Sequence, residues 1–168
     1  GRSGKFYAYQ RFDVMPDIVA TAKALAGGIP IGAIIAKEEV ASAFEFGDHG
    51  TTFGGNPFTC RVACAALDTI EEEHIVEQAA EKGAFMMKLL EEKLAGNPSV
   101  KDIRGMGLMI GVELDRPARP VIDKMFEYNV LGNAAHGTVV RFLPPLIISK
   151  EQIERVVEVL VLSLEQTS

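Results

Sequence analysis

The chain has 168 residues, the usual size of one domain with room for a second small one. Apolar residues make up 48% and charged residues 24%, which excludes a wholly disordered or collagen-like chain. A net charge of −6 repels phosphate backbones, so we expect no nucleic-acid partner. No uncharged apolar run approaches the ~20 residues of a spanning helix, so we expect no membrane segment.

The first 57 residues are rich in glycine and in short apolar runs. Residues 31–36 form one such run between turn residues, and they predict a strand that is buried on both faces. The charged residues after this run open a short helix. Asn56 followed by Pro57 is typical of a helix start, and we expect that helix to continue to about Glu72.

Two cysteines, Cys60 and Cys64, are too few for a disulfide framework. They stand four apart in the expected helix and share a face, where two thiolates could bind a metal ion. We interpret them as small core residues instead and expect no metal site. Unpaired cysteines without a recognisable signal peptide favour a cytoplasmic protein.

Residues 58–168 are more helical and more charged than the first 57 residues. Apolar residues recur at helical spacing after position 75, and Gly96 ends that pattern. Two later apolar runs predict strands with a helix between them, and Ser149 with Gln152 fits the capping box of a last helix. The strands are expected at 108–114 and 138–143, and the helix between them at 120–130. Strands that alternate with helices indicate an α/β or α+β fold.

Lys23 precedes a glycine-rich turn at Gly27 and Gly28, which leads into the strand predicted at 31–36. A lysine beside such a turn can lie in a pocket where another molecule approaches the backbone closely. An amine held in a water-poor pocket loses its charge and becomes a nucleophile that can form a Schiff base. The alternative, which spacing alone favours, is a solvated lysine on a short helix.

Thr51 and Thr52 stand before paired glycines and the helix start at Pro57. Backbone N–H groups and the positive end of the helix dipole favour an anion at such a position, and phosphate is the obvious candidate. The alternative is a plain loop capped by Asn56, and the residues by themselves do not decide between the two.

Arg141 is flanked by apolar residues inside the strand predicted at 138–143. A guanidinium in apolar surroundings is costly unless it is paired, and its planar shape suits bidentate binding of a carboxylate. The alternative, which the residues alone favour, is an arginine on an edge strand whose head reaches water.

Five stretches of the chain, in order, resemble motifs of the class-III aminotransferases, which depend on pyridoxal phosphate (PLP). They cover essentially the whole chain and are residues 1–10, 16–33, 48–57, 104–113 and 140–146. Within that family they are most similar to the acetylornithine aminotransferases, with the ornithine aminotransferases next. Several long motifs in the right order make the resemblance specific, and it favours the functional interpretation of Lys23, Thr52 and Arg141.

The resemblance implies a role for each of these three residues. Lys23 would form the Schiff base with PLP and then move a proton between the substrate α-carbon and the cofactor. Thr52 would donate its hydroxyl to the PLP phosphate of the neighbouring subunit in a homodimer. Arg141 would hold the α-carboxylate of the amino-acid or 2-oxo-acid substrate.

The resemblance also implies the fold, an α/β fragment of the fold-type-I PLP-dependent transferases. Residues 1–57 would be the end of the large PLP-binding domain, and residues 58–168 a helical linker with a small α+β C-terminal domain. The family's aspartate that pairs with the pyridine nitrogen would lie upstream of Gly1, together with half of the large domain. We therefore expect a fragment that does not transaminate alone, binds PLP poorly and exposes apolar surface in residues 1–57.

The implied reaction is amino-group exchange between N-acetylornithine and 2-oxoglutarate, a step of arginine biosynthesis. Ornithine or another ω-amino acid is an alternative amino donor. A stable domain fragment without catalytic activity is the alternative from another class of function.

Overall fold

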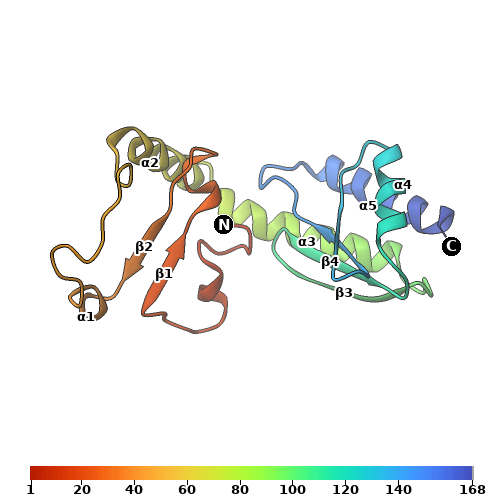
Figure 1. The fold of residues 1–168 in the computed structure, drawn as a ribbon. Helices are drawn as coiled ribbons and strands as arrows, with labels where there is room; N and C mark the ends of the chain where they lie inside the picture. The colour runs from red at the N-terminus through yellow and green to blue at the C-terminus, as the bar shows by residue number, and fades with distance from the viewer. Residues whose placement is uncertain (168) are drawn as a thin grey trace. The chain divides into compact units, whose positions relative to one another are not determined.

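The computed structural model describes residues 1–167. They form two compact units (Figure 1). One unit is Tyr9–His74, and the other joins Gly1–Ala8 to the residues from Ile75 onward. The boundary expected between residues 57 and 58 is a different division, because it separates the family's large and small domains. That boundary stays a prediction. Among the described residues, no helix is long and apolar enough to cross a bilayer.

The unit Tyr9–His74 contains a two-stranded antiparallel sheet and one long helix. The sheet pairs β1 (Ile18–Thr21) with β2 (Ala33–Ala36), and the helix is α2 (Pro57–Glu72). The helix has its predicted bounds. Asn56 caps it by accepting a hydrogen bond from the Thr59 N–H at 2.9 Å. The short helices are η1 (Ala8–Arg11), η2 (Lys23–Ala26) and α1 (Glu38–Ala41).

The strand β2 lies within the run predicted at 31–36, but the prediction that it is buried on both faces is wrong. Ile34 is 72% exposed and Ile35 is 52% exposed. A strand with apolar residues on both faces needs a covering layer on each side, and this unit covers neither of these side chains. The expectation that residues 1–57 expose apolar surface is confirmed.

Cys60 and Cys64 are both free on α2, and the prediction that both are core residues is wrong for Cys64, which is exposed. The buried positions of this helix are Thr59 and Ala63, each one residue before a cysteine. One residue turns a helix by about 100°, so the cysteines lie beside the buried stripe and outside it, with Cys60 partly buried. Residues 1–167 contain no group of three His, Cys, Asp or Glu side chains placed to hold a metal ion.

The other unit is built on a four-stranded antiparallel sheet with the order β3-β4-β6-β5. Its strands are β3 (Val100–Met106), β4 (Met109–Leu114), β5 (Asn133–Ala135) and β6 (Val139–Phe142). The strands β4 and β6 confirm those predicted at 108–114 and 138–143. The strand β3 carries several charged residues and β5 has three residues in all, and neither is predicted from the sequence.

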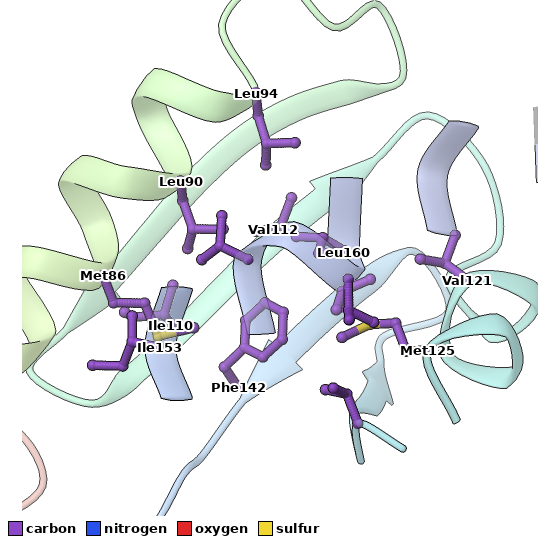
Figure 2. Close-up of a cluster of buried hydrophobic side chains, with 14 of the residues drawn as sticks. Met86, Leu90, Leu94, Ile110, Val112, Val121, Met125, Phe142, Ile153 and Leu160 are labelled. Atoms are coloured by element: carbon purple, nitrogen blue, oxygen red, sulfur yellow. The ribbon is translucent and has the colours of Figure 1, made fainter. Parts of the chain in front are cut away.

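Three helices complete this unit, namely α3 (Ile75–Lys93), α4 (Arg119–Glu127) and α5 (Lys150–Gln166). The helix α5 packs against both α3 and α4. Figure 2 shows the core that results, where Val112 and Phe142 of the sheet meet Leu90 of α3 and Leu160 of α5. All four side chains are at least 96% buried, so this unit has a continuous apolar core.

The predicted capping box at the start of α5 is confirmed. The Gln152 N–H donates to Ser149 Oγ at 3.2 Å, and the Ser149 N–H donates to Gln152 Oε1 at 2.9 Å. Two backbone donors at the helix end are thereby satisfied by side chains.

Candidate active site

Lys23 is held in a strained backbone conformation. It is the first residue of η2, and its φ of 56° lies in the left-handed region, which costs a residue with a β-carbon roughly 1–2 kcal/mol. Buried Ala26 lies at the other end of this turn, and η2 packs against α2. Strain of this kind persists only where surrounding structure imposes it, and it clusters at functional sites.

The Lys23 amine is exposed and unpaired within residues 1–167, since it makes no hydrogen bond or ion pair there. The unit has one other lysine, Lys37, whose amine is paired with Asp17 at 2.5 Å. The pocket that we expected around Lys23 is not formed by residues 9–74, since these leave the side chain exposed.

Thr52 lies in the loop before α2, and local hydrogen bonds shape that loop. The Gly54 N–H donates to Thr51 Oγ1 at 3.2 Å, and Asn56 Nδ2 donates to the Phe53 carbonyl at 2.8 Å. Thr52 itself is exposed. Its hydroxyl therefore belongs to an exposed loop that leads into a 16-residue helix, whose N-terminal end favours an anion.

Arg141 lies on β6, which is an inner strand of the sheet, so the alternative of an edge-strand arginine is wrong. Its neighbours across the sheet are Gly111 on β4 and Asn133 on β5. The adjacent Val140 and Phe142 are buried in the core, and alternation along a strand places Arg141 on the opposite face.

The guanidinium of Arg141 has an unused donor. Its Nε is buried and has no hydrogen-bond partner within residues 1–167. A buried N–H without a partner is costly, and a bound anion would satisfy it.

Arg141 also lines a pocket of about 890 Å³, a size typical of small-molecule sites. The end of β6, the loop before β5 and the first turns of α5 form its walls. Glu151 and Arg155 of α5 line the same pocket, and neither is predicted from the sequence as a site residue. Both are charged residues of an amphipathic helix, and in the sequence they look like any solvated helix face.

Arg2 is a further residue of interest, to which neither the residue pattern nor the resemblance of residues 1–10 assigns a role. Its Nη1 donates to the Pro144 carbonyl at 2.7 Å and to the Leu108 carbonyl at 3.1 Å. The Leu108 N–H donates back to the Arg2 carbonyl at 2.9 Å. Burial lowers the pKa of Arg2 from its ordinary value, and hydrogen bonds to two carbonyls compensate for the lost water.

The three predicted site residues are divided between the units. Lys23 and Thr52 belong to Tyr9–His74, and Arg141 belongs to the other unit. Their donor groups fit PLP and an amino-acid substrate: a free amine for an aldehyde, a hydroxyl near a helix start for a phosphate, and a guanidinium for a carboxylate.

Comparison with known proteins identifies the family. The profile of the aminotransferase class-III family matches residues 1–164. The chain therefore belongs to the class-III aminotransferases, a family that uses PLP.

Individual relatives agree with this assignment. The chain is 49% identical to the acetylornithine aminotransferase of Methanothermobacter thermautotrophicus over 160 residues, which are 95% of this chain and 41% of that protein. It is 46% identical to the ornithine aminotransferase of Halalkalibacterium halodurans over 159 residues, 94% of this chain and 39% of that protein. The chain thus spans about two fifths of the length of these curated relatives.

Solved structures show the same partial coverage. The acetylornithine aminotransferase from Elizabethkingia anophelis matches with a TM-score of 0.90 and 32% identity, over 98% of this chain and 43% of that one. The ornithine aminotransferase from Toxoplasma gondii matches with a TM-score of 0.92 and 34% identity, over 99% of this chain and 41% of that one. The predicted fold class, an α/β fragment of the PLP-dependent transferase fold, is confirmed.

Proposed function

We propose that this chain is part of an acetylornithine aminotransferase, which exchanges an amino group between N-acetylornithine and 2-oxoglutarate in arginine biosynthesis. The observation that carries the proposal is the 49% identity, over 95% of the chain, to an enzyme of that name. Ornithine is the second candidate donor, favoured by the 46% identity to an ornithine aminotransferase. Another ω-amino acid remains a further alternative.

The proposed roles follow from the chemistry of each side chain. PLP, when bound, supplies the electron sink that makes the substrate α-carbon acidic. Lys23 would hold the cofactor through its amine and, once released, move the proton at the substrate α-carbon. Its unpaired amine and strained backbone support this role.

Thr52 and Arg141 would bind the two anionic groups. The Thr52 hydroxyl would donate to the PLP phosphate of the neighbouring subunit in a homodimer, which its exposed position permits. Arg141 would orient the substrate α-carboxylate, a role supported by its unused buried Nε.

We also propose that the 168 residues do not transaminate by themselves, since they span 41% of a related enzyme. The two free cysteines support a cytoplasmic location for the protein. A stable fragment without cofactor binding is the contrasting hypothesis.

Covalent labelling separates the two hypotheses. The complete gene product that carries this chain is mixed with PLP, reduced with borohydride and digested, and the modified peptides are mapped by mass spectrometry. We expect the label on Lys23, its loss in Lys23→Arg, and its retention in the matched control Lys37→Arg. Labelling spread over surface lysines and unchanged in Lys23→Arg would refute the role of Lys23 and support the inert fragment.

The amino donor is tested with the complete gene product that carries this chain. Initial rates with N-acetylornithine, ornithine and 4-aminobutyrate are compared at a fixed 2-oxoglutarate concentration. We expect the largest kcat/KM with N-acetylornithine. A larger kcat/KM with either of the other donors would replace the proposed substrate.

A further inference from the structure

The pairing of β4 with β6 ends beside the pocket that Arg141 lines. The last paired residues at this end are Ile110 and Phe142. Two positions further in the antiparallel register, Leu108 would stand opposite Pro144. Proline has no N–H, so the strand ladder cannot continue there and backbone carbonyls are left without donors.

Arg2 supplies the missing donors. Its Nη1 donates to the Pro144 carbonyl at 2.7 Å and to the Leu108 carbonyl at 3.1 Å. Hydrogen bonds from a charged group are shorter and stronger than those between neutral groups. A single guanidinium therefore joins the end of β6 to the turn between β3 and β4.

Two glycines allow the backbone of this segment to come close enough. A Cβ on Gly107 would lie 2.2 Å from the Arg2 carbonyl oxygen, and its φ of 55° is left-handed. On its other side, a Cβ on Gly83 of α3 would lie 2.3 Å from the Gly107 carbonyl oxygen. Three backbone segments are thus in direct contact, and this fixes the place from which the Arg2 side chain extends.

The end of β6 is also what places the Arg141 guanidinium. Pro144 follows Arg141 by three residues, and both line the same pocket together with Leu143 and Pro145. Arg141 Nε has no partner within residues 1–167 that would hold the side chain in one orientation. A shift at the end of the strand would therefore move the guanidinium with little resistance.

We propose that Arg2 is a positioning residue for Arg141, because it fixes the end of β6 from which Arg141 meets a substrate carboxylate. The proposal rests on the carboxylate-binding role proposed above for Arg141. Arg2 acts through the backbone at Pro144 and has no contact with the substrate in this role.

The test uses the complete gene product with PLP and compares Arg2→Met, Arg2→Lys and Arg141→Met with the unmodified protein. The matched control is Arg119→Met, an exposed arginine of the same unit that pairs with Asp123 on its own helix. Calorimetry gives the Kd of glutarate, a dicarboxylate that cannot accept an amino group. Steady-state kinetics give KM and kcat for 2-oxoglutarate, and thermal unfolding gives the Tm.

We expect Arg2→Met to raise the glutarate Kd and the KM by roughly ten- to a hundredfold, the cost of weakening a hydrogen bond to a charged group, while kcat changes much less. Arg2→Lys should recover most of the affinity, because an ammonium can donate to both carbonyls. Arg119→Met should bind glutarate as the unmodified protein does. A merely structural role for Arg2 would lower the Tm and leave the Kd unchanged.

Each contrary outcome has a separate meaning. Glutarate binding that is lost in Arg141→Met but normal in Arg2→Met overturns the positioning role and leaves the role of Arg141 intact. Normal binding in Arg141→Met overturns the proposed function of Arg141, and the positioning role with it. Should Arg2→Met fail to fold, Arg2→Lys is compared with Arg2→Gln, and equal affinity in these two overturns the proposal.

Discussion

Lys23 keeps its backbone at a φ of 56° although it carries a β-carbon, and its amine has no partner within residues 1–167. A residue chosen for stability at this position would be glycine, which adopts such a φ without penalty. The four other residues with a β-carbon and a positive φ are Asp13, His74, Asn129 and His136, types that adopt this conformation more readily than lysine. The strain at Lys23 fits a lysine that serves a reaction, because such strain clusters at functional sites.

This strain gives a first prediction at the scale of one residue. Lys23→Gly should be more stable than Lys23→Ala by about 1 kcal/mol, because both variants lose the amine and only glycine accepts a left-handed backbone freely. Urea unfolding of the two variants measures the difference. An alanine variant as stable as the glycine variant would show that the folded chain does not hold position 23 in this conformation.

Single residues also show what the sequence can and cannot reveal. Asn56 could be predicted as a helix cap because its partner, Thr59, is three positions away. Arg2 could not be singled out, because its acceptors lie 106 and 142 residues further along the chain. The side of the sheet on which Arg141 lies, and its inner-strand position, likewise depend on pairing with β4 and β5.

Among the elements, those with local signals could be predicted and those that depend on neighbours could not. The helix α2 has its predicted bounds because a cap and a first-turn proline mark its start. The strand β3 carries charged residues at 101, 102 and 104, and pairing with β4 overrides this weak strand pattern. The prediction that β2 is buried is wrong, because an apolar run in the sequence does not reveal which residues cover the strand.

The capping box of α5 gives a second prediction. Ser149→Ala should lower the free energy of unfolding by about 1 kcal/mol, the usual cost of losing a helix cap. Ser149→Asn should keep most of the stability of the unmodified protein, because asparagine is also a good N-cap residue. The hydrogen bond from Ser149 also lowers the pKa of Glu151, so this pKa should rise in the alanine variant. Chemical denaturation and NMR titration measure the two effects, and an unchanged Glu151 pKa would contradict the second.

The strand pair β1 and β2 gives a third prediction, on pH. A hydrogen bond from Lys37, followed by its charge, lowers the pKa of Asp17 below the usual 3.8. A carboxyl whose pKa falls on folding stabilises the fold above its unfolded pKa, and the gain is lost as the pH falls through the folded pKa. Lys37→Met should therefore be destabilised at pH 6 and match the unmodified chain near pH 2.

Urea unfolding at the two pH values measures this difference in stability. The NMR-detected pKa of Asp17 should also rise in Lys37→Met. The matched control is Lys101→Met, which removes an exposed lysine from the other unit. Equal loss of stability at both pH values would show that Lys37 acts through packing and not through the ion pair.

At the scale of the whole molecule, the two units differ in their cores. The buried apolar side chains of Tyr9–His74 are two alanines, Ala26 and Ala63. The other unit buries many large side chains, such as Met86, Leu90 and Leu160. Stabilisation by burial grows with the apolar area removed from water. The unit Tyr9–His74 therefore gains much less stabilisation from burial than the other unit.

This contrast gives a fourth prediction. Backbone amides of β1 and β2 should exchange with deuterium at least about a hundredfold faster than those of α3 and β4, because local opening requires less free energy where few apolar contacts are broken. Hydrogen exchange followed by mass spectrometry measures both sets in one sample. Equal protection in the two units would show that residues 9–74 are stabilised by something other than buried apolar area.

The attachment of Arg2 to Leu108 and Pro144 also bears on how the protein is made. During synthesis, Arg2 leaves the ribosome long before its two acceptors exist. The hydrogen bond to Pro144 therefore forms only after more than 140 further residues have been added. Contacts between such distant residues form late, because closing a long loop costs entropy before any contact repays it. The exposed isoleucines of β2 emerge before that point. A chaperone that binds exposed apolar side chains can therefore bind the nascent chain at this stage.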